Sequence, residues 1–304
     1  DCLKTLLKIQ RIHYLCIPTN NQLVFFMEKN NSSVCVVYYS PTHTSGKIAK
    51  AIAEGLATET CQLVDLTTDN RIEPIEVQAD WLILAAPVYG GRIPVSAMER
   101  FKRLKMTRTD GTPTKAVVAV VYGNRDYDDA LLELCNEAEA LGFTPVAGGA
   151  FIGEHSFSRP EMPTAQNRPD ANDLQIARTF GQQAAACAEV ASTGCKLHVK
   201  GNMPYRELMQ TPPVCPVSTD QCNGCGKCVK LCPVHAITLT DGKPVTDAQA
   251  CTLCCACVKM CPSHARVFDT PFTKVLFENF NARKEPELFY ITDKKQKENP
   301  PETD

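Results

Sequence analysis

The chain has 304 residues, of which 44% are hydrophobic and 17 are cysteines, and its formal net charge is −2. This length predicts about two domains, and the balanced charge provides no basic surface of the kind that binds nucleic acid. No run approaches the roughly 18 apolar residues of a membrane span, so we expect no membrane-spanning segment. So many cysteines in a chain of this length favour metal chemistry in a reducing compartment over disulfides.

Residues 1–33 form an N-terminal extension of doubtful nativity. The first methionine is Met27, and residues 1–26 contain neither a continuous apolar core nor the A-x-A site of a signal peptide. We therefore expect translation to begin at Met27 and the protein to be cytoplasmic. An organelle-targeting segment within residues 1–26 is the alternative.

From residue 34 to 194, short apolar runs alternate with helix-like segments. The runs are VCVVYYS, CQLVDL, WLILAAP, AVVAVVYG and TPVAGGAFIG, and most are nearly continuous rather than alternating. Strands buried on both faces have this pattern. The alternation predicts a doubly wound α/β domain with a parallel sheet. Within these runs, Cys35 and Cys61 are interpreted as small core residues.

The ends of four predicted strands carry Gly, Tyr, Asn, Ser and Thr, in the segments SPTHTSGK, APVYGGRIP, YGNRDYDD and FIGEHSFSRP. Sheets of this type bind ligands outside the carboxyl ends of their strands, and these side chains suit a planar aromatic ligand with a phosphate tail. The first loop is not a nucleotide triphosphate loop, because Pro41 and Ile48 replace the required Gly and Ser or Thr. A dinucleotide G-x-G-x-x-G motif is absent.

Residues 195–215 are rich in proline and lack periodicity, which predicts a linker. Beyond it, residues 216–270 contain CNGCGKCVKLCP and CTLCCACVKMCP, two copies of C-x2-C-x2-C-x3-C-P. Three thiolates at this spacing hold one cubane cluster, and the fourth reaches the other cluster. Zinc is the alternative, but zinc sites use C-x2-C pairs separated by a longer stretch.

The spacing therefore predicts two [4Fe–4S] clusters with crossed ligands. Cluster I would be bound by Cys222, Cys225, Cys228 and Cys261, and cluster II by Cys251, Cys254, Cys257 and Cys232. In the second copy, Cys255 replaces Gly226 of the first, and we interpret it as a spare thiol, with ligation as the alternative. His235 and His264 follow the two C-P steps and are expected to begin turns rather than to bind iron.

After the clusters, residues 271–292 are aromatic enough to dock on a domain, and the polar residues 293–304 are expected to be a disordered tail. The cysteine segment resembles bacterial-type ferredoxins with two clusters. Over about residues 34–290, the chain resembles the fused proteins that join a flavodoxin-like domain to such a ferredoxin. The resemblance implies an α/β flavodoxin-like doubly wound parallel sheet, plus a small α+β ferredoxin-like two-cluster domain.

The first loop is similar to the S/T-x-T-G-x-T phosphate loop of flavodoxins, and the next two loops look like their flavin-flanking loops. The resemblance thus implies FMN as the ligand. Its candidate residues are Ser40, Thr42, His43, Thr44 and Ser45 around the phosphate, and Pro87, Tyr89, Gly90, Gly91, Asn124, Arg125 and Tyr127 around the ring. Tyr89 would pack on the isoalloxazine, with Tyr127 as a second aromatic candidate. His43 departs from the family, because the usual loop has Gly at this position.

The implied function is electron transfer between FMN and the two clusters, with an unidentified redox protein as donor or acceptor. One alternative is a flavin-dependent oxidoreductase that reduces a small acceptor such as a quinone or nitro compound. Another is a non-enzymatic redox sensor or assembly module whose flavin site is weakened by His43. No substrate pocket is marked in the sequence, so the choice between electron carrier and enzyme stays open.

Overall fold

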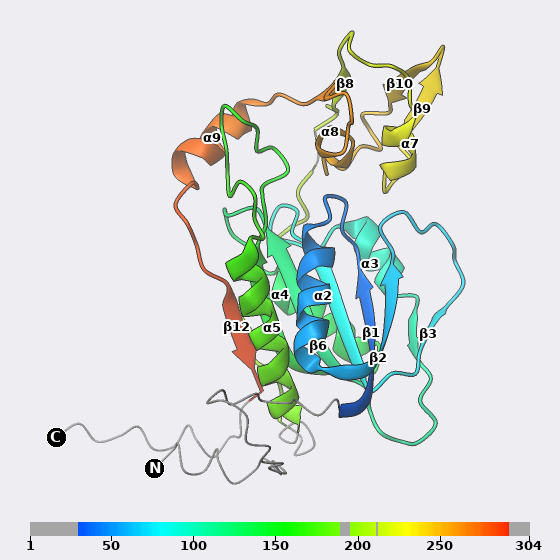
Figure 1. The fold of residues 1–304 in the computed structure, drawn as a ribbon, viewed down its shortest axis with the longest axis vertical. Helices are drawn as coiled ribbons and strands as arrows, with labels where there is room; N and C mark the ends of the chain where they lie inside the picture. The colour runs from blue at the N-terminus through cyan, green and yellow to red at the C-terminus, as the bar shows by residue number, and fades with distance from the viewer. Residues whose placement is uncertain (1–29, 189–194, 211, 292–304) are drawn as a thin grey trace, which may run out of the picture.

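The computed structural model describes residues 30–188, 195–210 and 212–291 (Figure 1). The expectations about Met27, residues 1–26 and the tail 293–304 lie outside these residues. Within the described part of the chain, no helix is long and apolar enough to cross a membrane.

A six-stranded sheet with the order β12-β7-β6-β4-β1-β2 forms the larger domain. Its strands are β1 (Asn30–Tyr38), β2 (Thr58–Asp65), β4 (Trp81–Pro87), β6 (Lys115–Tyr122), β7 (Thr144–Ile152) and β12 (Glu287–Tyr290). The first five are parallel, as predicted, whereas β12 pairs antiparallel with β7. The C-terminal segment thus completes the sheet of the first domain.

Helices cover both faces of this sheet, so each central strand is buried on both sides (Figure 1). On one face lie α2 (Thr44–Leu56) and α5 (Ala171–Ala186), and on the other α3 (Val95–Phe101) and α4 (Ala130–Ala140). Cys35 is fully buried, as expected. Cys61 is exposed, contrary to the prediction, because it lies on the edge strand β2, most of whose side chains face solvent.

The second domain is small and lies over the carboxyl ends of the central strands (Figure 1). It contains β8 (Val217–Ser218), α7 (Lys227–Leu231), β9 (Ile237–Thr240), β10 (Lys243–Thr246), α8 (Ala256–Lys259) and β11 (Arg266–Val267). β9 pairs with β10, and β8 pairs with β11, both antiparallel. The chain then returns through α9 (Pro271–Asn279) to β12. A short parallel pair, β3 (Ile75–Val77) and β5 (Leu104–Met106), lies beside the main sheet.

The predicted linker is fixed to the first domain, although most of its described residues are exposed. The buried carboxylate of Asp129 accepts hydrogen bonds from the backbone and side-chain amides of Asn202 and from the backbone of Arg206. The Arg92 guanidinium lies 4.7 Å from the centroid of the Tyr205 ring. These contacts hold residues 202–206 beside α4 and fix the path of the chain toward the second domain.

Two glycines allow α2 and α5 to approach within backbone contact. A Cβ at Gly55 would lie 1.9 Å from the Arg178 carbonyl oxygen, and one at Gly181 would lie 2.2 Å from that of Ile52. We expect Gly181→Ala to lower the free energy of unfolding by about 1–3 kcal/mol, because the helices must separate. Chemical denaturation measures this, with the exposed Gln182→Ala as the control, expected to change stability by less than about 0.5 kcal/mol. Equal stabilities of the two variants would contradict this prediction.

Candidate functional site

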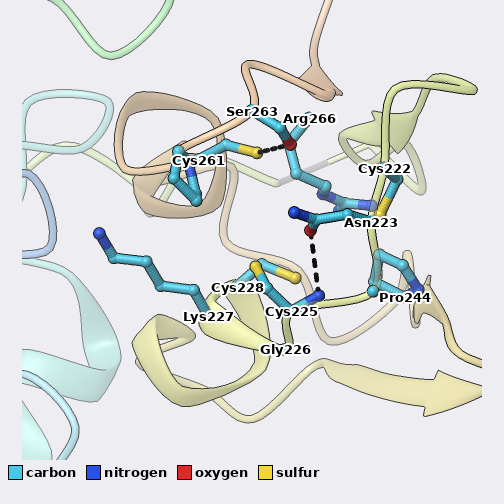
Figure 2. A pocket seen from close by; sticks show the side chains of 12 residues that line it. Cys222, Asn223, Cys225, Gly226, Lys227, Cys228, Pro244, Cys261, Ser263 and Arg266 are labelled. Atoms are coloured by element: carbon cyan, nitrogen blue, oxygen red, sulfur yellow. Dashed lines mark hydrogen bonds between the residues drawn. The ribbon is translucent and has the colours of Figure 1, made fainter.

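Two cavities in the small domain are each lined by four of the predicted ligand cysteines. Cavity I encloses about 310 Å³, part of it open to solvent, and is lined by Cys222, Cys225, Cys228 and Cys261 (Figure 2). Cavity II encloses about 320 Å³ and is lined by Cys232, Cys251, Cys254 and Cys257. Each cavity combines three thiols of one motif with the last thiol of the other, which is the crossed arrangement expected from the spacing.

The cysteines surround a space rather than a point. Among the described residues, no three His, Cys, Asp or Glu side chains converge as ligands of a single ion. The all-thiol ligand sets of the two cavities fit cubane clusters, which are held by four thiolates.

The two motifs share one backbone conformation, although their sequences differ. Gly224 and Gly226 have φ of 69° in the first copy, and Leu253 and Cys255 have φ of 55° at the matching positions of the second. The left-handed conformation costs a residue with a side chain about 1–2 kcal/mol. Leu253 and Cys255 are both buried, so packing offsets this strain. Cys255 also lines cavity II, beside the four predicted ligands.

The turn role expected for the two motif histidines agrees with the backbone. His235 and His264 have φ of 53° and 50°, and their amides donate to the carbonyl oxygens of Cys232 and Cys261. Both side chains are exposed, and neither residue is among those that line the cavities.

The cysteines of the two cavities differ in their exposure to solvent. Three thiol-bearing residues of cavity II, Cys232, Cys254 and Cys257, are buried, whereas Cys225 of cavity I is exposed. The Ala236 amide donates to the Cys232 sulfur over 3.2 Å. Solvent exposure and hydrogen bonds to sulfur set cluster potentials, so the two sites are electrostatically distinct.

At the carboxyl end of β1, the first loop forms the start of α2. The buried Ser40 hydroxyl accepts a hydrogen bond from the Gly46 amide over 3.0 Å, and the Ser40 backbone amide donates to the Thr67 hydroxyl. His43 adopts the left-handed conformation, with φ of 65°, at the position where the related loops have Gly. Its side chain is exposed, so the structure tolerates the residue without burying it.

The loop fits a phosphate group. The Ser45 side chain is fully buried, yet its hydroxyl has no hydrogen-bond partner, and the N-cap residue His43 makes no side-chain hydrogen bond to the first turn of α2. Free amides of a first helical turn attract anions, and a phosphate oxygen would satisfy both the amides and the Ser45 hydroxyl. Thr42 and Thr44 are half-buried beside them.

The loop after β4 adopts a tight turn at the same edge of the sheet. Tyr89 and Arg92 exchange backbone hydrogen bonds, and Gly90 and Gly91 between them have φ of 58° and 86°. A Cβ at Gly91 would lie 2.2 Å from a carboxylate oxygen of Asp128, so this position requires glycine. Pro87, the last residue of β4, precedes this turn and is half-buried.

Residues of the loop after β6 bond to distant parts of the chain. Tyr127 is buried in the core, where its hydroxyl donates to Glu287 over 3.0 Å. The buried Asn124 amide donates to the carbonyls of Phe280 and Ala282. The Arg125 carbonyl accepts from Lys284. These residues anchor the returning C-terminal segment, a role that only the tertiary structure reveals.

Cavity II lies against the flavin-flanking loop of the first domain. Burial raises the pKa of Tyr89 well above its usual range, and the nearby thiols of Cys254 and Cys255 add to the shift. Arg100 donates to the Pro233 carbonyl over 2.6 Å, directly after the ligand Cys232. Tyr89 therefore lies at the junction between the candidate flavin loops and cavity II.

The sequence did not single out Arg100 or Arg266. Arg266 is 3% exposed, lines cavity I and donates to the Cys257 sulfur of cavity II over 3.9 Å. Its sequence signal is visible only when the two motif copies are aligned, because its counterpart after the first motif is Ile237.

Comparisons with known proteins agree with this arrangement. A flavodoxin family model matches residues 36–163, and a 4Fe-4S dicluster domain model matches residues 221–274. Among curated proteins, no significant match is found. The chain therefore joins a flavodoxin domain to a dicluster ferredoxin domain, as its motifs suggested. It is an electron-transfer protein whose domains bind FMN and two [4Fe–4S] clusters.

Solved structures similar to the chain include flavodoxins. One from the domain Archaea is 14% identical, with 52% of this chain and 99% of that one covered and a TM-score of 0.36. Flavodoxin 1 of Bacillus cereus is 18% identical, with 51% and 98% covered and a TM-score of 0.36. Two-electron reduced Megasphaera elsdenii flavodoxin is 19% identical, with 50% and 98% covered and a TM-score of 0.33. Scores this low add nothing to the family assignment.

We expect Ser45→Ala to weaken FMN binding about tenfold, because a hydrogen bond to a charged group contributes about 1.5–3 kcal/mol. The stability of the FMN-free protein should not fall, since the hydroxyl has no partner within the chain. Fluorescence titration with FMN and chemical denaturation measure the two quantities. Ser40→Ala is the matched comparison. It removes the hydrogen bond that Ser40 accepts from the Gly46 amide, so, unlike Ser45→Ala, it should lower the stability of the FMN-free protein. Unchanged FMN affinity in Ser45→Ala would contradict the phosphate role.

Burial lowers the pKa of His155 to about 4, with the charges of Lys259 and Arg125 contributing. The unfolded chain binds this proton more readily, so the contribution to stability is complete above about pH 6.5 and is lost as the pH falls toward 4. When the pH falls from 7.5 to 5.5, we expect the unmodified protein to lose about 1 kcal/mol more of its free energy of unfolding than His155→Gln loses. Urea denaturation at both pH values tests this, with the exposed His198→Gln as the control. Identical pH dependence in His155→Gln and the unmodified protein would show the prediction to be wrong.

Proposed function

We propose that the protein relays electrons between FMN and the two clusters within one chain, with cluster II next to the flavin. The observation that carries this proposal is the position of Tyr89, which belongs to the candidate flavin loop and lies within electrostatic range of the thiols of Cys254 and Cys255. The same edge of the sheet carries the phosphate loop, so an FMN bound there would lie under the small domain.

When bound, FMN supplies exchange of two electrons, and each cluster supplies exchange of one. The chain brings these groups together and restricts water at their junction. Arg100 links α3 to Pro233, and Lys259 of α8 bonds to Glu154 and to the Ser158 carbonyl. These contacts hold the small domain on the loops from two sides.

Cluster I has the position of an external port. Cys225 of cavity I is exposed, whereas Cys232, Cys254 and Cys257 of cavity II are buried. We infer that a separate one-electron redox protein exchanges electrons at cavity I. The route would then run from the flavin through cluster II to cluster I, in either direction.

The linker favours this relay over reduction of a small acceptor at the flavin. A Cβ at Gly90 would lie 2.6 Å from the Met209 Cβ, so the Met209 side chain of the linker covers this turn. A quinone or nitro compound would have to displace this segment to reach a ring at that turn.

Anaerobically reconstituted protein should contain about eight iron atoms and one FMN per chain. After photoreduction of the flavin, the cluster absorbance should bleach and a paramagnetic signal should appear within the same molecules, independent of protein concentration. Variants with Cys254→Ser are expected to lose this flavin-to-cluster step, whereas Cys187→Ser, remote from both cavities, should retain it. Absence of bound FMN, or flavin reduction without any cluster reduction, would refute the relay.

A further inference from the structure

Arg266 is a buried cation without an acidic partner. Its guanidinium donates to the Ser218 hydroxyl, the Pro216 carbonyl and the Thr246 hydroxyl, at 3.0, 2.7 and 2.7 Å. Among the described residues, no carboxylate forms an ion pair with it. A buried charge is costly unless an opposite charge compensates it. The negative charge that compensates Arg266 must therefore come from another source.

The surroundings of Arg266 supply that charge from both cavities. One N–H group donates to the Cys257 sulfur of cavity II over 3.9 Å, while the residue itself lines cavity I. Its Nε–H is buried and has no hydrogen-bond partner. Figure 2 shows the guanidinium among the cysteines that line cavity I. The cation thus lies between two sites that each hold four thiolates.

The internal duplication shows that this arginine is not required by the fold. Ile237 is the counterpart of Arg266 after the first motif, is 4% exposed and lines cavity II. Each residue is the first of a short strand that follows its motif turn: Ile237 begins β9 and Arg266 begins β11. The same backbone position therefore accepts an apolar side chain, and only the second copy carries a charge.

We propose that Arg266 is an electrostatic bridge between the two clusters, which stabilises the state in which both are reduced at once. Each reduction adds one negative charge to a cluster, and the two added charges repel each other. A guanidinium between them attracts both added charges, and in low-dielectric surroundings this attraction offsets their repulsion. The small domain can then hold two electrons, one on each cluster. This number matches the two electrons that a flavin exchanges. The role of Arg266 in accepting both flavin electrons rests on the proposed relay, whereas its electrostatic effect on the clusters does not.

Three variants of the full-length, cluster-loaded protein separate charge from packing and hydrogen bonding. Arg266→Ile copies the residue of the first motif, Arg266→Gln retains donors without the charge, and Arg266→Lys retains the charge. Lys230→Met removes an exposed lysine of α7 and controls for the general loss of a surface charge. A redox titration followed by paramagnetic resonance measures both cluster potentials and the spin-coupled signal of the doubly reduced state.

We expect Arg266→Ile and Arg266→Gln to make the second reduction about tenfold less favourable, which corresponds to a downward shift of about 59 mV for one electron. The spin-coupled signal should then appear only at lower potentials. Arg266→Lys should retain most of the original behaviour, and Lys230→Met should change it little. If Arg266→Ile fails to bind its clusters, Arg266→Gln and Arg266→Lys still provide the comparison between neutral and charged side chains.

Equal second potentials in the neutral variants and the unmodified protein would overturn the bridge. So would an equal shift in Arg266→Lys and Arg266→Gln, because the effect would then follow the guanidinium shape and not its charge. Because the titration monitors the clusters directly, a protein that lacks FMN would refute the relay and leave this measurement intact.

Discussion

The crossed ligation of the two cysteine motifs is the constraint on which the rest of the structure depends. Each cavity takes three thiols from one motif and the last from the other, so neither half of the small domain can form its site alone. The apolar core of the small domain is small. Binding of the clusters adds to its stability, because the free energy of metal binding contributes directly to the free energy of folding. Both motifs consequently adopt the same backbone, even where Leu253 and Cys255 must assume the left-handed conformation that glycine adopts in the first copy.

The rigid small domain is then held on the carboxyl edge of the sheet by contacts from several directions. Arg100 reaches Pro233 from below, Lys259 reaches Glu154 and Ser158, and Asp129 fixes the linker through Asn202 and Arg206. The chain finally returns to the first domain, where β12 pairs with β7. Because the polypeptide enters and leaves the small domain through fixed segments, cavity II is kept beside the flavin-flanking turn and Cys225 of cavity I stays in contact with solvent.

Two of the buried polar groups without hydrogen-bond partners lie where a negatively charged group would bind. The Ser45 hydroxyl at the start of α2 and the Nε–H of Arg266 are both buried and unpaired. Such groups are costly, and native proteins retain few of them. One lies where a phosphate suits the loop, and the other lies between two thiolate-lined cavities. In each case the chain has arranged a donor before its partner is bound, which reduces the reorganisation needed on binding and on electron transfer.

The sequence by itself determined the chemistry that depends on local spacing. The C-x2-C-x2-C-x3-C-P repeats defined the ligand sets, and continuous apolar runs predicted the parallel sheet, because both patterns are written in consecutive residues. Tertiary structure alone decided which side chains meet across long separations. It buried Tyr127 against Glu287, used Asn124 to hold the C-terminal segment, exposed Cys61 on an edge strand, and placed Arg266 between two cavities. Those roles depend on burial and on partners far away in the chain, which residue type and spacing do not encode.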